Sequence, residues 1–131
     1  MNRYDPLKAP NPQQWLAEDE QQRINLVEDY HRRARVDLPN VQIHAAMHVI
    51  VENQIALAEE VPMRTLKRLQ KEGLDRHDAI HAMAMVLVEH LPRILAADST
   101  DQPDSGHAGK LIYEGLERLT AESWRRSMDD E

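Results

Sequence analysis

The stretch from Ile43 to Ile55, which reads IHAAMHVIVENQI, decides the fold class of this chain. Its apolar residues recur every three or four positions, at Ile43, Met47, Ile50, Val51 and Ile55. This spacing lines one face of an α-helix, whereas a half-buried strand would alternate apolar and polar residues. The β-branched run Val49–Val51 favours a strand by propensity alone, but the length of the pattern favours a helix. We therefore predict a helix that ends near Ala58.

Similar patterns on both sides of this stretch predict an all-α fold, a small bundle of about four to six helices. Asn11 and Pro12 suit a helix start, and Gly73 suits a position just past a helix end. The polar segment Glu18–Arg23 is either an exposed face or a short break between two helices. The other predicted helices run from Asn11 to about Val36, from Pro62 to Gly73, from Asp75 to Pro92, and from about Lys110 to Arg126.

The chain length of 131 residues favours a single helical domain over residues 1–131. Residues 1–10 are polar, contain two prolines and are expected to be irregular. Residues 98–109 are rich in Asp, Ser, Pro and Gly, which predicts a mobile loop. Residues 127–131 are expected to form a disordered tail.

Net charge and the lengths of the apolar runs restrict the kinds of partner that we expect this protein to bind. The net charge of −7 argues against nucleic-acid binding, and the basic run His31–Arg35 is best explained as a charged helix end. No apolar run is long enough to span a bilayer, and the first residues lack the apolar core of a signal peptide. We therefore expect a cytoplasmic protein without membrane contacts. The sequence leaves a homodimer open and identifies no small-molecule substrate.

Two histidine pairs at helical spacing are the main functional signal, His44 with His48 and His77 with His81. Residues four apart lie one turn apart on the same face of a helix. If the two helices pack antiparallel, His44 faces His81 and His48 faces His77, and four imidazoles can surround one metal ion. Because the chain has no cysteine, its metal ligands must be nitrogen or oxygen atoms. Zinc is favoured, with iron and nickel as alternatives.

Three carboxylates are candidates for supporting roles. Glu52 follows His48 by one turn and could hydrogen-bond to that ring or hold a second metal ion. Asp78 follows His77 directly and fits the cap of its helix better. Glu89 lies two turns beyond His81. The remaining three histidines are not expected to bind metal. His31 lies in the basic run, His90 lies on the side of its helix opposite His81, and His107 lies in the predicted loop.

The stretches from His44 to Gln54 and from Glu72 to His81 resemble a group of small uncharacterised bacterial proteins that carry a domain of unknown function. The resemblance extends to Trp15 and Leu16 and covers most of the chain. It implies a small helical bacterial protein and supplies no established activity.

A looser likeness concerns the adjacent pair His77-Asp78, with His48 upstream and Asp98 downstream. It is similar to the His…His-Asp…Asp pattern of the HD-type metal phosphohydrolases, which are also helical. In that superfamily no second histidine follows one turn after the pair, so His81 departs from the pattern.

Three functional interpretations remain open at this stage. The first is a metal-binding helical protein, with or without hydrolytic or redox catalysis. The second is an interaction module or homo-oligomer in which the histidines are polar core residues. The third is a pH-responsive core without metal, because histidine titrates near neutral pH.

Overall fold

The computed structural model describes residues 3–34, 41–90 and 105–129, which form seven helices. The described chain is all-helical, as predicted, but its seven helices exceed the predicted four to six. In chain order the helices are α1 (Pro12–Ala17), α2 (Glu20–Arg33), α3 (Val41–Ala56), α4 (Glu60–Lys71), α5 (Arg76–Glu89), α7 (Ser105–Arg118) and α8 (Ala121–Asp129).

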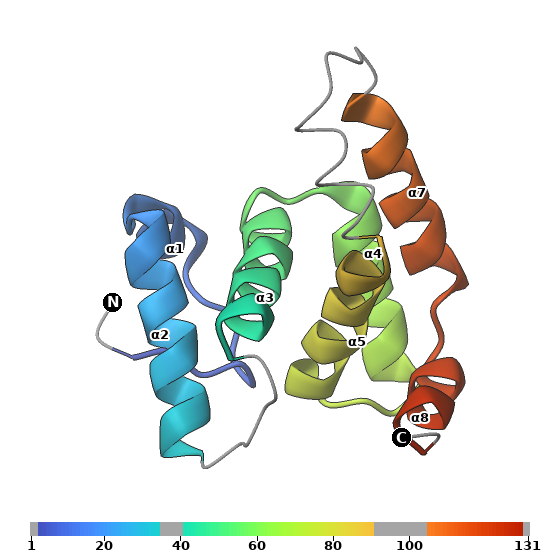
Figure 1. Cartoon of the computed structure of the whole chain (residues 1–131), viewed down its shortest axis with the longest axis horizontal. Coiled ribbons are helices and arrows are strands. Elements are labelled where there is room, and N and C mark those ends of the chain that lie inside the picture. Colours follow the sequence, from blue (N-terminus) through green and yellow to red (C-terminus); the bar gives the residue numbers. More distant parts are fainter. Residues whose placement is uncertain (1–2, 35–40, 91–104, 130–131) are drawn as a thin grey trace.

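Helix α3 lies in the middle of the molecule (Figure 1). Helices α1 and α2 cover one side of it, and α5 and α4 cover the other. Helices α7 and α8 lie furthest from α2 and pack on α4 and α5. The segments with the two histidine pairs, α3 and α5, are therefore direct neighbours.

The additional helices arise from two capped breaks. Asp19 accepts a hydrogen bond from the backbone N–H of Gln22 at 2.7 Å and starts α2, which settles the polar segment as a break. Near the C-terminus, the predicted single helix is divided because Thr120 and Ser123 cap each other. Each backbone N–H donates to the other residue's hydroxyl oxygen at 3.0 Å. This reciprocal cap starts α8 just after α7 ends.

Two further caps fix the turn between α4 and α5. Gly73 adopts a φ of +106° just past α4, a conformation that side chains other than glycine rarely adopt. The N–H groups of Gly73 and Leu74 donate to the carbonyls of Gln70 and Leu69, at 3.1 Å each. Asp75 then caps α5 by accepting from the N–H of Asp78 at 2.8 Å. The first turn of α5, with Arg76 and His77, is thereby fixed.

The core consists of two apolar clusters that meet at α3. The larger apolar cluster joins α3, α4, α5, α7 and α8, with Leu69, Ile80 and Met83 fully buried. The smaller apolar cluster joins residue 4, α1, α2 and α3 around Tyr4 and Trp15. The polar residues His44, His48 and Glu52 lie on α3 at four-residue spacing, and of these His48 and Glu52 are fully buried.

The structure describes parts of the three segments that were expected to lack regular structure. Residues 3–10 form no helix, yet Tyr4 and Pro6 are fully buried. Of the predicted loop, residues 98–104 lie outside the described residues, and α7 already begins at Ser105. Helix α8 continues to Asp129, into the predicted tail. Within the described ranges, no helix is both long and apolar enough to cross a membrane.

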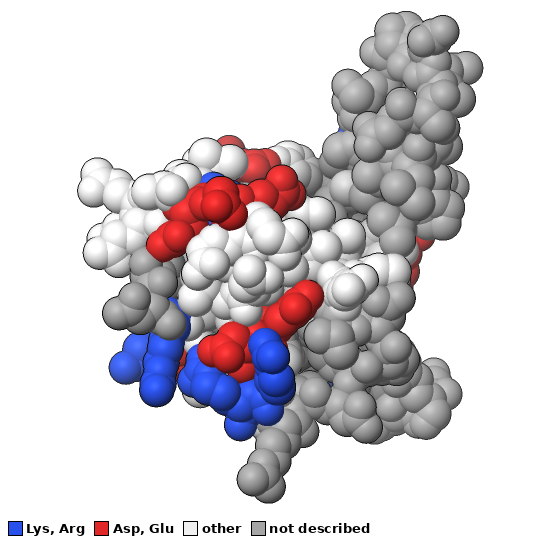
Figure 2. All heavy atoms as spheres, turned by 60° about the vertical axis from the view of Figure 1, so that its left-hand side comes forward, with Lys and Arg blue, Asp and Glu red and all other residues white. Residues whose placement is uncertain are grey.

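The first and last turns of α2 carry opposite charges. The described part of the basic run, His31–Arg33, lies in the last turn, with Arg32 and Arg33 exposed, and acidic Glu20 lies in the first turn. In Figure 2 the Lys and Arg side chains gather toward the lower end of this face of the molecule. The acidic residue at the start of α2 and the basic residues at its end complement the dipole of this helix.

Candidate metal centre

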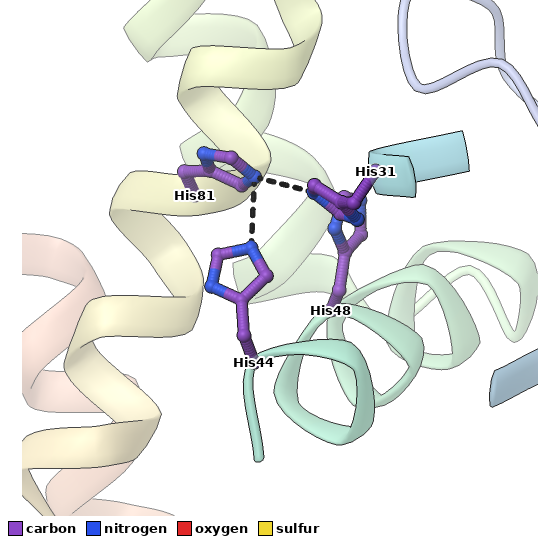
Figure 3. Close-up of side chains that lie close together, drawn as sticks. All are labelled: His31, His44, His48 and His81. Carbon is purple, nitrogen blue, oxygen red and sulfur yellow. Dashed lines mark hydrogen bonds between the residues drawn. The ribbon is translucent and has the colours of Figure 1, made fainter. Parts of the chain in front are cut away.

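Helices α2, α3 and α5 bring four histidines together, and each offers a ring nitrogen within 4.8 Å of the others. The four-histidine group consists of His31, His44, His48 and His81. Figure 3 shows the rings pointing toward one another from α2, α3 and α5. His31 and His48 are buried, with 2% and 0% of their surface exposed, whereas His44 and His81 are half-buried. The group is therefore enclosed on one side and partly accessible on the other.

A backbone hydrogen bond fixes the orientation of the His31 ring. Its Nδ1 lies 2.9 Å from the Val27 carbonyl oxygen, one turn earlier in α2. Because a carbonyl oxygen can only accept, Nδ1 carries the ring hydrogen. The other nitrogen, Nε2, therefore presents a lone pair to the group. This is the arrangement of metal-binding histidines, whose second nitrogen usually donates to a carbonyl or carboxylate.

Three Nε2 atoms face one another at short distances. The His81 Nε2 atom lies 3.1 Å from that of His44 and 3.4 Å from that of His31. Because the His31 Nε2 atom carries no hydrogen, at most one of these two contacts is a hydrogen bond when the rings are neutral. A zinc ion bound by nitrogen at about 2.0–2.1 Å in a tetrahedron separates its ligand atoms by about 3.3–3.4 Å. The two observed separations are close to this value, so these three rings could also share a cation.

The fourth ring, that of His48, is hydrogen-bonded to the Tyr4 hydroxyl, which in turn is hydrogen-bonded to the Glu52 carboxylate. The Tyr4 hydroxyl donates its only hydrogen to Oε2 of Glu52 and lies 2.7 Å from Nε2 of His48. The hydroxyl oxygen must then accept from His48, so Nε2 carries the ring hydrogen. The Nδ1 atom of His48 is left with a lone pair, and it has no hydrogen-bond partner among the described residues although it is fully buried. A metal ion would satisfy this atom.

Arg76, at the start of α5, holds the carboxylate in place. Its guanidinium donates to both Glu52 oxygens, at 2.8 Å and 2.7 Å, and to the Pro6 carbonyl at 2.9 Å. Both side chains are buried, with 6% and 1% of their surface exposed. The paired charges cancel, and each is hydrogen-bonded as a buried charge must be. The N-terminal segment, α3 and α5 are thereby joined behind His48.

His77 lies beside the four-histidine group without belonging to it. Its ring centroid is 4.0 Å from that of His81, 5.7 Å from His48 and 5.3 Å from Tyr30. Its Nε2 atom is buried and has no hydrogen-bond partner in the described part of the chain. The two histidine pairs therefore meet in space as antiparallel packing predicts, but one of the four expected ligands lies to the side.

The histidines of the site are held in the neutral form that binds metals. Burial, together with the neighbouring histidines, lowers the pKa of His44 to about 4 and that of His81 to about 2. Burial also lowers the pKa of His48 and His31, and it lowers the pKa of His77 to about 4. At neutral pH the rings need not lose protons before they coordinate a cation.

The structure places the remaining predicted residues as follows. Glu52 lies behind His48, in the supporting position that its spacing suggested. Asp78 lies near Asp75 and Arg125, its pKa is raised mainly by burial, and it is not part of the four-histidine group. Glu89 is exposed, and His90 lies against Gly115 of α7. His107 has no described side chain.

The sequence analysis missed three residues of the site. His31 was set aside as part of a basic run, although it follows the fully buried Val27 by one helical turn, which signals an inward position. Tyr4 lies in a segment without periodicity, and Arg76 lies at a helix start. No sequence pattern points to either of these two.

Comparisons with protein-family models, with curated proteins and with solved structures found no match. The interpretation of the site therefore rests on its own residues. The HD-type likeness gains no support from them, because Asp78 does not join the histidines and Asp98 lies outside the described residues.

Proposed function

We propose that this chain is a transition-metal-binding protein whose ligands are His31, His44, His48 and His81. One observation carries the proposal: four ring nitrogens converge within 4.8 Å. Two of these rings are already hydrogen-bonded through the opposite nitrogen, His31 to a carbonyl and His48 to Tyr4. Burial of lone pairs against one another is unfavourable unless a cation lies between them.

Zinc is the metal that the ligand set supports best. The ligands are all imidazole nitrogens, and the two separations at His81 are close to those in a tetrahedron of zinc–nitrogen bonds. Iron and nickel also accept imidazole, so the proposal ranks them second. Four protein ligands close the coordination of a structural zinc site, whereas a catalytic site needs an open position.

Elemental analysis of untagged protein after exhaustive dialysis tests the proposal. We expect about one metal ion per chain in the wild type and almost none in the double variant His48→Ala/His81→Ala. His90→Ala is the matched control, because His90 lies on α5's far end against α7 and should retain the metal. Equal metal content in the wild type and the double variant would contradict the proposal, as would a wild type that binds none of the three metals when they are supplied.

A further inference from the structure

The two unpartnered buried nitrogens at this site differ in what could satisfy them. The Nδ1 atom of His48 belongs to a ring of the four-histidine group, so the proposed metal accounts for it. The Nε2 atom of His77 belongs to a ring outside that group, so the metal does not. This nitrogen is therefore open to a partner from outside the chain, next to the proposed metal.

The position of His77 restricts this partner to a small molecule. Its ring centroid is 4.0 Å from that of His81, 5.7 Å from His48 and 5.6 Å from His31. A group placed among these rings contacts the metal and His77 together only if it is a few atoms in size. His44, His77 and His81 are all half-buried, and the Nε2 atom of His77 is itself buried.

The charge of the site favours an anion. In the described part of the chain, the four-histidine group contains no carboxylate, and Glu52 behind it is neutralised by Arg76. A divalent metal held by neutral imidazoles would therefore keep its full charge in a mostly buried place, which is unfavourable. Asp5 and Asp75 also act on His77, but both are exposed and their charge is screened by solvent.

We propose that the metal centre binds a small anion, such as hydroxide, azide or a short carboxylate, and that His77 holds this anion by donating a hydrogen bond from Nε2. The inference rests on the proposed metal site. His77 then acts on the external ligand and is not itself a metal ligand. The anion adds a fifth ligand to the metal beside the four imidazoles, and it accepts a hydrogen bond from the nitrogen that the protein leaves unpartnered.

Cobalt-substituted protein with azide as the probe tests this inference. Cobalt content is measured first, and azide is then added while the visible absorption of the metal is recorded. We expect a saturable spectral change in the wild type. In His77→Phe the cobalt content should be unchanged and the azide affinity at least about tenfold lower, because a hydrogen bond to a charged group is lost. His77→Gln keeps a donor and should recover part of the affinity, and His90→Phe should resemble the wild type.

The outcomes separate the two proposals. A wild type that takes up no cobalt overturns both. Cobalt uptake without any response to azide overturns only the anion site, and so does an unchanged azide affinity in both His77 variants. If His77→Phe and His77→Gln both lose cobalt while their helical circular dichroism is retained, His77 is a metal ligand and the inference is wrong.

Discussion

The larger apolar cluster and the four-histidine group both include residues of α3, but they differ in whether the chain itself supplies all their partners. The apolar cluster has its partners within the chain, with Leu69, Ala79, Ile80 and Met83 fully buried among one another. The histidine side leaves two buried nitrogens unpartnered within the described ranges, and at most one of its two short Nε2–Nε2 contacts can be a hydrogen bond when the rings are neutral. The apolar side of α3 is thus completed by folding alone, and under our proposal the histidine side is completed by a metal ion. This difference predicts that the two sides respond to different perturbations.

The largest expected effect comes from separating the charges behind His48. Arg76→Met should destabilise the protein by about 3–5 kcal/mol, because it leaves Glu52 buried without its partner. Denaturant unfolding at neutral pH measures the loss. The double variant Glu52→Gln/Arg76→Met should recover part of it, since no unpaired charge remains. A loss in the single variant that the double variant does not reduce would show that charge is not the cause.

Metal removal should affect only the histidine side. At a free zinc concentration 1,000 times the dissociation constant, bound metal adds about 4 kcal/mol to the free energy of unfolding. Thermal unfolding with and without a chelator measures this increment. Leu69→Ala should lower stability by about 2–5 kcal/mol through a cavity in the apolar cluster, while leaving the metal increment unchanged. If this variant also removed the increment, the two sides would be one unit.

Acid should destabilise the metal-free protein through the same histidines. Their folded-state pKa is lowered, to about 4 for His44 and about 2 for His81, against 6.5 in the unfolded chain. The unfolded state therefore binds more protons below pH 6.5, and stability falls as the pH decreases from there toward 4. The slope is at most about 1.4 kcal/mol per pH unit for each buried ring, and smaller for half-exposed His44.

Thermal unfolding of chelator-treated protein between pH 7 and pH 4.5 measures this dependence. The variant His44→Gln/His81→Gln, which lacks two of the titrating rings, should show a shallower slope. An equal slope in the variant and the wild type would assign the acid sensitivity to other groups.

The smallest expected effect is the loss of metal affinity when the hydroxyl group that supports His48 is removed. Tyr4→Phe removes the hydroxyl that accepts from His48 and donates to Glu52. Loss of such a supporting group usually weakens metal binding by about 10–100-fold. Competition with a chromophoric zinc chelator measures the affinity, and Tyr30→Phe serves as the control, because Tyr30 contacts His31 and His77 through its ring. Equal affinities in the two variants would remove Tyr4 from the site.

The sequence predicted those parts of the molecule that follow from local periodicity. The helical class follows from the apolar spacing. The histidine pairs suggested that α3 and α5 could meet, but the sequence could not establish that contact. The number of helices was underestimated, because the Thr120–Ser123 cap divides a segment whose apolar pattern continues across it. The roles of Tyr4 and Arg76 could not be predicted, because they depend on contacts with Glu52 across 48 and 24 residues. Such contacts are set by the packing of whole helices.

The residues of the proposed site lie far apart along the chain, and this affects when the site can form during folding. Tyr4 supports His48 across 44 residues, and His31 meets His81 across 50 residues. During synthesis, the four-histidine group cannot close until α5 has left the ribosome, when more than half of the chain is already exposed. Uptake of the proposed metal would therefore be a late event, and the rate of metal binding after refolding would report the docking of α5 on α2 and α3.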